Sequence, residues 1–113
     1  MKINISGHHV EITDAIIDVI NSKYVKVAKH FPSLMSLEAI LTVDKNAHKI
    51  EVVTNYENQK VAVSASDDDM YVAIGNSVKK MESALQHRKG VLKANKHNKY
   101  QVSQSELVAD AHP

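Results

Sequence analysis

Three consecutive aspartates, Asp67 to Asp69, form the densest group of possible metal ligands or catalytic acids in the chain. Calcium-binding loops place their ligands at alternate positions around a glycine, and this run has no such pattern. The run stands instead just before an amphipathic segment, where carboxylates can accept hydrogen bonds from free backbone N–H groups and meet the positive end of a helix dipole. The pattern therefore favours a helix start over a metal site.

The other residues that could do chemistry are scattered. His8 and His9 are adjacent, so their side chains would point apart on an extended segment, and no His-x3-His spacing occurs. No serine lies in a Gly-x-Ser-x-Gly elbow, and a chain with three glycines and no cysteine offers neither a phosphate-binding loop nor a thiol nucleophile. We therefore expect no catalytic residue, no metal and no cofactor, and a protein that is not an enzyme.

The overall composition indicates one globular domain with a single core. Of the 113 residues, 43% are hydrophobic and 24% are charged, which is the balance of a soluble protein. No apolar run approaches the roughly 18 residues that a membrane span needs, and the first residues contain no apolar signal region. We expect a cytoplasmic protein with no membrane partner and no small-molecule substrate.

Hydrophobic periodicity predicts six elements that would position these residues. Residues 2–6 alternate as a strand that Gly7 ends, and Thr13 can cap a helix over residues 14–31. Residues 37–43, 49–55 and 60–66 alternate again with short connections between them, which favours antiparallel pairing. A long second helix begins at the aspartates, reaches about residue 96, and has this apolar stripe: Tyr71, Ile74, Val78, Met81 and Leu85.

The order of these elements predicts an α+β fold, a two-layer sandwich with the order β-α-β-β-β-α. Each helix has one apolar stripe and each strand has one apolar side, so both helices can cover one face of a four-stranded sheet. The other face of the sheet would remain largely polar. We expect residues 1–97 to form the domain and residues 98–113, which show no clear period, to form a flexible tail.

Basic residues are unevenly distributed, although the net charge is only +1. Lys23, Lys26 and Lys29 recur on neighbouring turns of the first helix, and seven basic residues stand against one acid between positions 79 and 99. Lys89 and Lys96 project onto the sector of the apolar stripe, which predicts that the last turns of the second helix extend beyond the core.

Two basic helices side by side would form a cationic surface suited to phosphate groups. With one phenylalanine and no tryptophan, the chain has little aromatic surface for stacking unpaired bases, so structured RNA is the favoured partner. A generic structured-RNA-binding protein or RNA chaperone, on a double-stranded-RNA-binding-like sandwich, is compatible with this pattern. The residues predicted to bind RNA are Lys23, Lys26, Lys29, Lys79, Lys80, His87, Arg88, Lys89, Lys93 and Lys96.

Three segments carry a resemblance to a known family. The N-terminal "MKINISGHHVEITDAI", the "DMYVAI" of residues 69–74 and the "HRKGVLK" of residues 87–93 resemble the bacterial ribosome hibernation factors. That group contains the short hibernation-promoting factor and the ribosome-associated inhibitor often called protein Y. The resemblance covers nearly everything but the tail. It implies the same fold, monomeric binding to the small ribosomal subunit and the intact ribosome where messenger and transfer RNAs would sit, and suppression of translation in stationary phase or stress.

The resemblance also assigns individual positions. Six lysines match the family's ribosomal-RNA contacts: Lys23, Lys26, Lys29, Lys80, Lys89 and Lys93. The chain departs from the family's usual pattern at Ser83-Ala84, where Arg-Gln is common, and at His87, where lysine is common. Arg88 is placed to compensate. Whether the chain helps ribosomes to pair or keeps them single is left open by the resemblance, because the tail fits neither subtype fully.

Overall fold

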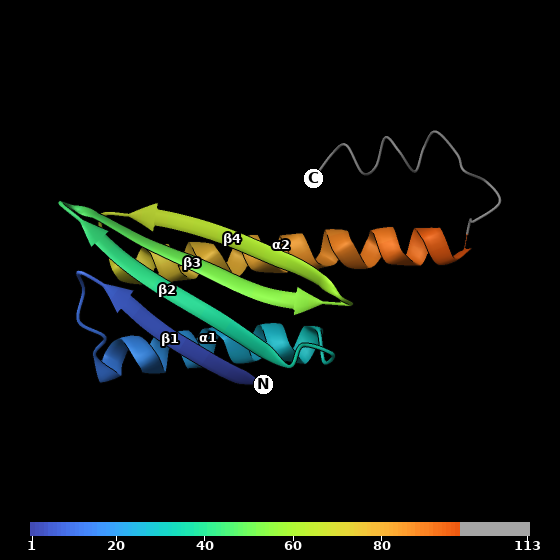
Figure 1. Ribbon diagram of the computed structural model, residues 1–113, viewed down its shortest axis with the longest axis horizontal. Coiled ribbons are helices and arrows are strands. Elements are labelled where there is room, and N and C mark those ends of the chain that lie inside the picture. Colours follow the sequence, from blue (N-terminus) through green and yellow to red (C-terminus); the bar gives the residue numbers. More distant parts are fainter. Residues whose placement is uncertain (98–113) are drawn as a thin grey trace.

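The structure is a computed structural model that describes residues 1–97, with side chains as far as residue 91 (Figure 1). The elements are β1 (Lys2–His8), α1 (Asp14–His30), β2 (Ser36–Asp44), β3 (Ala47–Tyr56), β4 (Gln59–Asp67) and α2 (Met70–His97). Their order and approximate bounds are those that the periodicity predicted. The tail expected at residues 98–113 lies outside the described residues.

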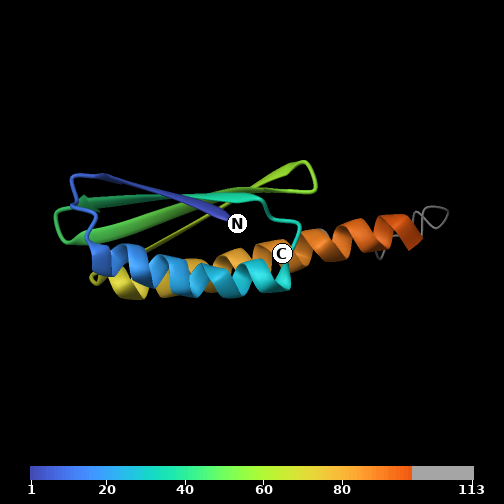
Figure 2. The ribbon, with the colours of Figure 1, turned by 90° about the horizontal axis from the view of Figure 1, so that it is seen from below.

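The four strands form one sheet in the order β1-β2-β3-β4. Strands β2, β3 and β4 pair antiparallel as predicted, whereas β1 pairs parallel to β2. A parallel neighbour requires a crossover connection, and α1 supplies it. Both helices lie under the same face of the sheet (Figure 2), so the two-layer α+β arrangement is confirmed.

The core lies between the sheet and the helices. The inward positions of β2 and β3 are almost fully buried, and they pack against the apolar stripe of α1. The alternate positions of the same strands, such as Glu38, Lys49 and Glu51, are exposed on the open face of the sheet. The main buried side chains are Ile16, Ile20, Tyr24, Val27, Leu37, Ala39, Leu41, Ile50 and Val52.

The buried stripe of α2 differs from the prediction at its first turn. Tyr71 is 45% exposed, and Met70 is buried in its place. Both positions are about one turn before Ile74, so helical spacing alone admits either residue. The sheet and α1 select the side of the helix that contains Met70, Ala73 and Ser77, which leaves the Tyr71 ring in solvent. The prediction of Tyr71 as a core residue was therefore wrong.

Gly7 does not end β1, which continues to His8. A Cβ atom at Gly7 would lie 2.9 Å from both the Val10 carbonyl oxygen and the Ile12 Cδ1 atom. Real Cβ atoms do not approach other atoms so closely. A residue without a side chain is therefore required where the chain after β1 folds back against the strand. Gly7 serves this close approach and does not end the strand.

A buried hydrogen bond joins the two helices. The Tyr24 hydroxyl lies 2.8 Å from the Ser77 Oγ atom, and Ser77 donates its own proton to the Ile74 carbonyl at 2.6 Å. Tyr24 is therefore the donor to Ser77. Burial raises the pKa of Tyr24 from 10.0 to about 12.

This raised pKa predicts a specific loss of stability in alkali. Tyr24 ionises near pH 10 in the unfolded chain but keeps its proton in the folded protein, so its contribution is present below pH 10 and is lost as the pH rises toward 12. The difference in pKa corresponds to about 2–3 kcal/mol in the free energy of unfolding. Urea unfolding at a series of pH values should show a shallower alkaline decline for Tyr24→Phe than for the parent. The Tyr71→Phe variant should follow the parent, and equal declines for all three proteins would contradict the assignment.

Candidate nucleic-acid interface

The lysines of α1 lie on the side of the helix opposite the core. Ile20, Tyr24 and Val27 are fully buried, which places Lys23, Lys26 and Lys29 on the exposed side, as the spacing predicted. All three lysines are exposed.

A groove of about 380 Å³ lies between α1 and α2. Lys23 and Lys26 line it from α1, and Lys79 lines it from α2. The Tyr24–Ser77 hydrogen bond fixes the two helices against each other beside these lysines. Three predicted RNA-binding residues from segments far apart in sequence are thereby brought together. The groove is completed by four α2 residues that were not among the predicted RNA-binding residues: Val72, Gly75, Asn76 and Val78.

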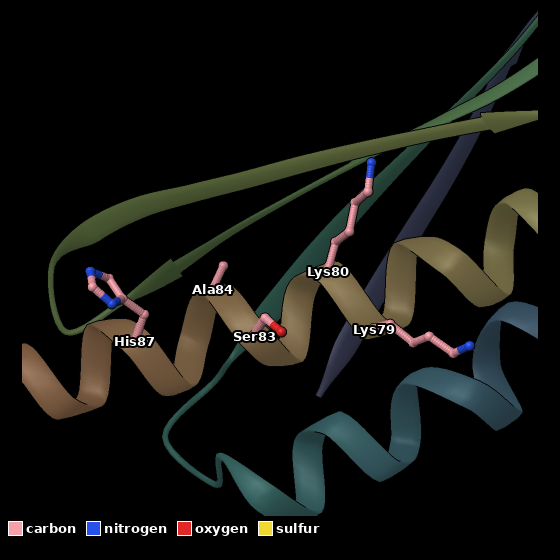
Figure 3. A pocket seen from close by; sticks show the side chains of 5 residues that line it. All are labelled: Lys79, Lys80, Ser83, Ala84 and His87. Carbon is pink, nitrogen blue, oxygen red and sulfur yellow. The ribbon is translucent and has the colours of Figure 1, made fainter. Parts of the chain in front are cut away.

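A second hollow, of about 460 Å³, lies along α2 (Figure 3). It is lined by Lys79, Lys80, Ser83, Ala84 and His87. Figure 3 shows Lys79 extending toward α1 and Lys80 extending toward the sheet, so the two neighbouring lysines point in different directions from the helix. Lys79 belongs to both hollows. The small side chains of Ser83 and Ala84 lie between the lysines and His87.

Two of the predicted lysines also have partners inside the protein. The Lys80 ammonium group donates a hydrogen bond to the Ser64 carbonyl on β4 at 2.8 Å. The Lys89 ammonium group lies 5.8 Å from the centroid of the buried Phe31 ring, within range of a cation–π contact. Both side chains remain exposed. Their replacement would therefore disturb internal contacts as well as the surface charge.

The remaining basic residues of α2 lie toward its end. Arg88 is half-buried, and its Nε atom is buried without a partner among the described residues. Lys93 and Lys96 are within the helix, but their side chains lie outside the described part of the chain. Figures 1 and 2 show that α2 continues past the sheet and past α1, as the basic residues on its apolar sector predicted.

One acid lies beside this basic surface and is already paired. The Glu82 carboxylate is 2.8 Å from the His30 Nδ1 atom at the end of α1. This pair is a second link between the helices, after Tyr24 and Ser77. Glu82 lines neither of the two hollows, so the groove that contains Lys23, Lys26 and Lys79 has only basic residues as its charged lining.

The aspartates before α2 act as the helix start that their position predicted. Asp69 Oδ1 accepts a hydrogen bond from the Tyr71 backbone N–H at 2.8 Å, and Asp67 Oδ2 accepts one from the Asp69 N–H at 3.0 Å. Among the residues whose side chains the structure describes, no group of three or more His, Asp or Glu is arranged to hold a metal ion. No helix in the described part of the chain is long and apolar enough to cross a membrane.

The amino-acid sequence is similar to those of known proteins. Residues 3–93 match the family model described as "Sigma 54 modulation protein / S30EA ribosomal protein". The ribosome hibernation promoting factor of Azotobacter vinelandii is 35% identical over 85 residues, which cover 75% of this chain and 79% of that protein. The factor of the same name from Escherichia coli K12 is 30% identical over 93 residues, which cover 82% of this chain and 98% of that protein.

Two solved structures are similar in fold. A ribosomal subunit interface protein from Coxiella burnetii superimposes with a TM-score of 0.76 at 20% identity, covering 80% of this chain and 99% of that one. The N-terminal domain of Thermus thermophilus Protein Y superimposes with a TM-score of 0.68 at 26% identity, covering 74% of this chain and 93% of that domain.

Proposed function

The chain belongs to the Sigma 54 modulation protein / S30EA ribosomal protein family, and from this premise we propose that it is a ribosome hibernation factor. It binds the small ribosomal subunit and the intact ribosome and suppresses translation in stationary phase or under stress. The family match spans residues 3–93, and relatives at 30–35% identity are named ribosome hibernation promoting factors. Hibernation factors are not a class of enzymes, and we propose that this chain acts by binding alone, in the cytoplasm.

The observation that carries the assignment of a binding surface is the convergence of Lys23, Lys26 and Lys79 in one groove. Ribosomal RNA presents a dense array of phosphates, and lysines that neutralise phosphates release counterions and so favour binding. Residues 1–97 would be the ribosome-binding domain. The wider surface includes the hollow beside Lys80 and His87 and the end of α2 with Arg88 and Lys89.

Sedimentation in a sucrose gradient tests this function. We expect the protein to travel with small subunits and intact ribosomes and to inhibit translation in vitro. A protein that instead spreads over all RNA, transfer RNA included, would be the generic structured-RNA-binding protein or RNA chaperone. Binding that is detected on neither ribosomes nor RNA would exclude both functions.

The affinity for ribosomes should fall steeply with salt. If about three phosphates are neutralised in the groove, the logarithm of the binding constant should fall with the logarithm of the salt concentration with a slope of roughly −2 to −3 from that contact alone. The magnesium concentration is held constant during the titration so that the ribosome remains intact. An affinity that is unchanged between low and high salt would contradict a phosphate-binding surface.

A further inference from the structure

Gly75 is a glycine that the packing of the protein does not require. It lies in the interior of α2, where glycine is less favourable than alanine because it loses more conformational freedom on folding. A Cβ atom at this position would have no neighbouring atom within 4 Å. A Cβ atom would therefore fit here without a clash inside the molecule, so the reason for a glycine at this position has to be sought in a partner of the protein.

The surroundings of Gly75 indicate what that reason is. Gly75 lines the groove between the helices, with Lys23 and Lys26 on the α1 side and Lys79 one helical turn further along α2. Asn76, whose side-chain amide can donate hydrogen bonds, lines the same groove. The absence of a side chain leaves the main chain of α2 bare at this point of a groove that three lysines line.

We propose that the groove over Gly75 seats a phosphate group of the RNA backbone, which approaches the main chain of α2 more closely than any larger residue would allow. The proposal rests on the proposed function, because it names the contact by which that RNA is held. The N–H groups within the helix are used in its own hydrogen bonds, so the phosphate is held by the side chains of Lys23, Lys26 and Lys79. Such a contact positions RNA without reading its sequence.

The type of cation in the groove fits this ligand. Lysine is a compact charge on a flexible stem, and it accommodates a phosphate in several orientations, whereas arginine favours a planar two-bond geometry. The groove has three lysines and no arginine in its lining. Three positive charges along one groove attract a negative group that enters from outside.

The test compares Gly75→Gln with Gly90→Gln. Gly90 is the matched control because it lies in the same helix, an added Cβ atom there likewise meets nothing within 4 Å, and it is outside the lining of the groove. Glutamine is uncharged and a good helix former, so both variants keep every lysine and should melt roughly 3 °C or more above the parent. Binding to purified small ribosomal subunits is measured by fluorescence anisotropy of the labelled full chain.

We expect Gly75→Gln to bind small subunits roughly tenfold or more weakly than the parent, as for the loss of a charge-assisted hydrogen bond, and Gly90→Gln to bind within about twofold of it. Parental affinity in Gly75→Gln would overturn the close approach while leaving the proposed function standing. Equal losses of affinity in both variants would also overturn the close approach, because the loss would then result from a more rigid helix. A parent protein that fails to bind subunits would instead refute the proposed function.

Discussion

Reversing the three lysines of the groove should reduce the affinity for the small ribosomal subunit by roughly 100-fold or more at about 0.1 M salt. The variant Lys23→Glu, Lys26→Glu, Lys79→Glu replaces three positive charges with three negative ones on one surface. It removes three phosphate contacts and adds repulsion to the RNA. All three side chains are exposed, so the free energy of unfolding should change only modestly.

A charge-matched control lies on the open face of the sheet. Lys2, Lys49 and Lys60 are exposed and alternate with inward-facing residues, so their reversal makes the same change in net charge away from the helices. We expect this control to retain most of its affinity. Lys80 and Lys89 are left unchanged in both variants because of their contacts with Ser64 and Phe31. If the groove variant is folded and still stops translation in vitro as well as the parent does, the groove is not the RNA-binding surface.

Phe31→Ala should cost about 3–5 kcal/mol in the free energy of unfolding, the largest effect on stability that we predict for a single substitution. The ring is 1% exposed and packs edge-on against Tyr56, with 5.8 Å between ring centroids and an angle of 84° between the planes. Lys89 lies over the same ring. Phe31 therefore joins the end of α1 to β3 and to α2, and its removal would leave a cavity where three elements meet.

Two further substitutions test which property of Phe31 accounts for this loss in the free energy of unfolding. Phe31→Leu keeps most of the apolar volume but removes the aromatic contacts, so it should cost less, about 1–2 kcal/mol. Val25→Ala, at a position that is 47% exposed on the same helix, should change the free energy of unfolding by no more than about 0.5 kcal/mol. Urea unfolding at neutral pH measures all three. A cost below 1 kcal/mol for Phe31→Ala would mean that the site around the ring collapses freely.

Much of the fold was predictable because the signals for it are local. Alternation over residues 37–43 identified β2, and the helical spacing of Ile16, Ile20 and Tyr24 identified the inner side of α1. These periods follow from the geometry of one strand or one helix and need no knowledge of its neighbours. The aspartate cap of α2 was predictable for the same reason, since Asp69 acts on the N–H group two residues away.

The candidate site was predictable only as a set of residue types. The lysines on each helix were identified from the sequence, but three outcomes depended on the placement of the helices: Lys79 faces α1, Lys80 is tied to β4, and Lys89 covers Phe31. Gly75 was missed because glycine in a helix carries no charge or donor that a motif search would select. Its position in a sequence that is otherwise helical was the one available signal.

The sequence by itself determined the six elements, their apolar sides, the cap of α2 and the basic character of both helices, because each depends on residues within a few turns of one another. The tertiary structure alone decided that β1 lies parallel to β2, that Met70 rather than Tyr71 is buried, and that a groove forms over Gly75. These outcomes depend on contacts between segments far apart in the chain, such as the bond between Tyr24 and Ser77. Such contacts set the rotation of one helix relative to another. The hydrophobic period of a single helix does not determine that rotation.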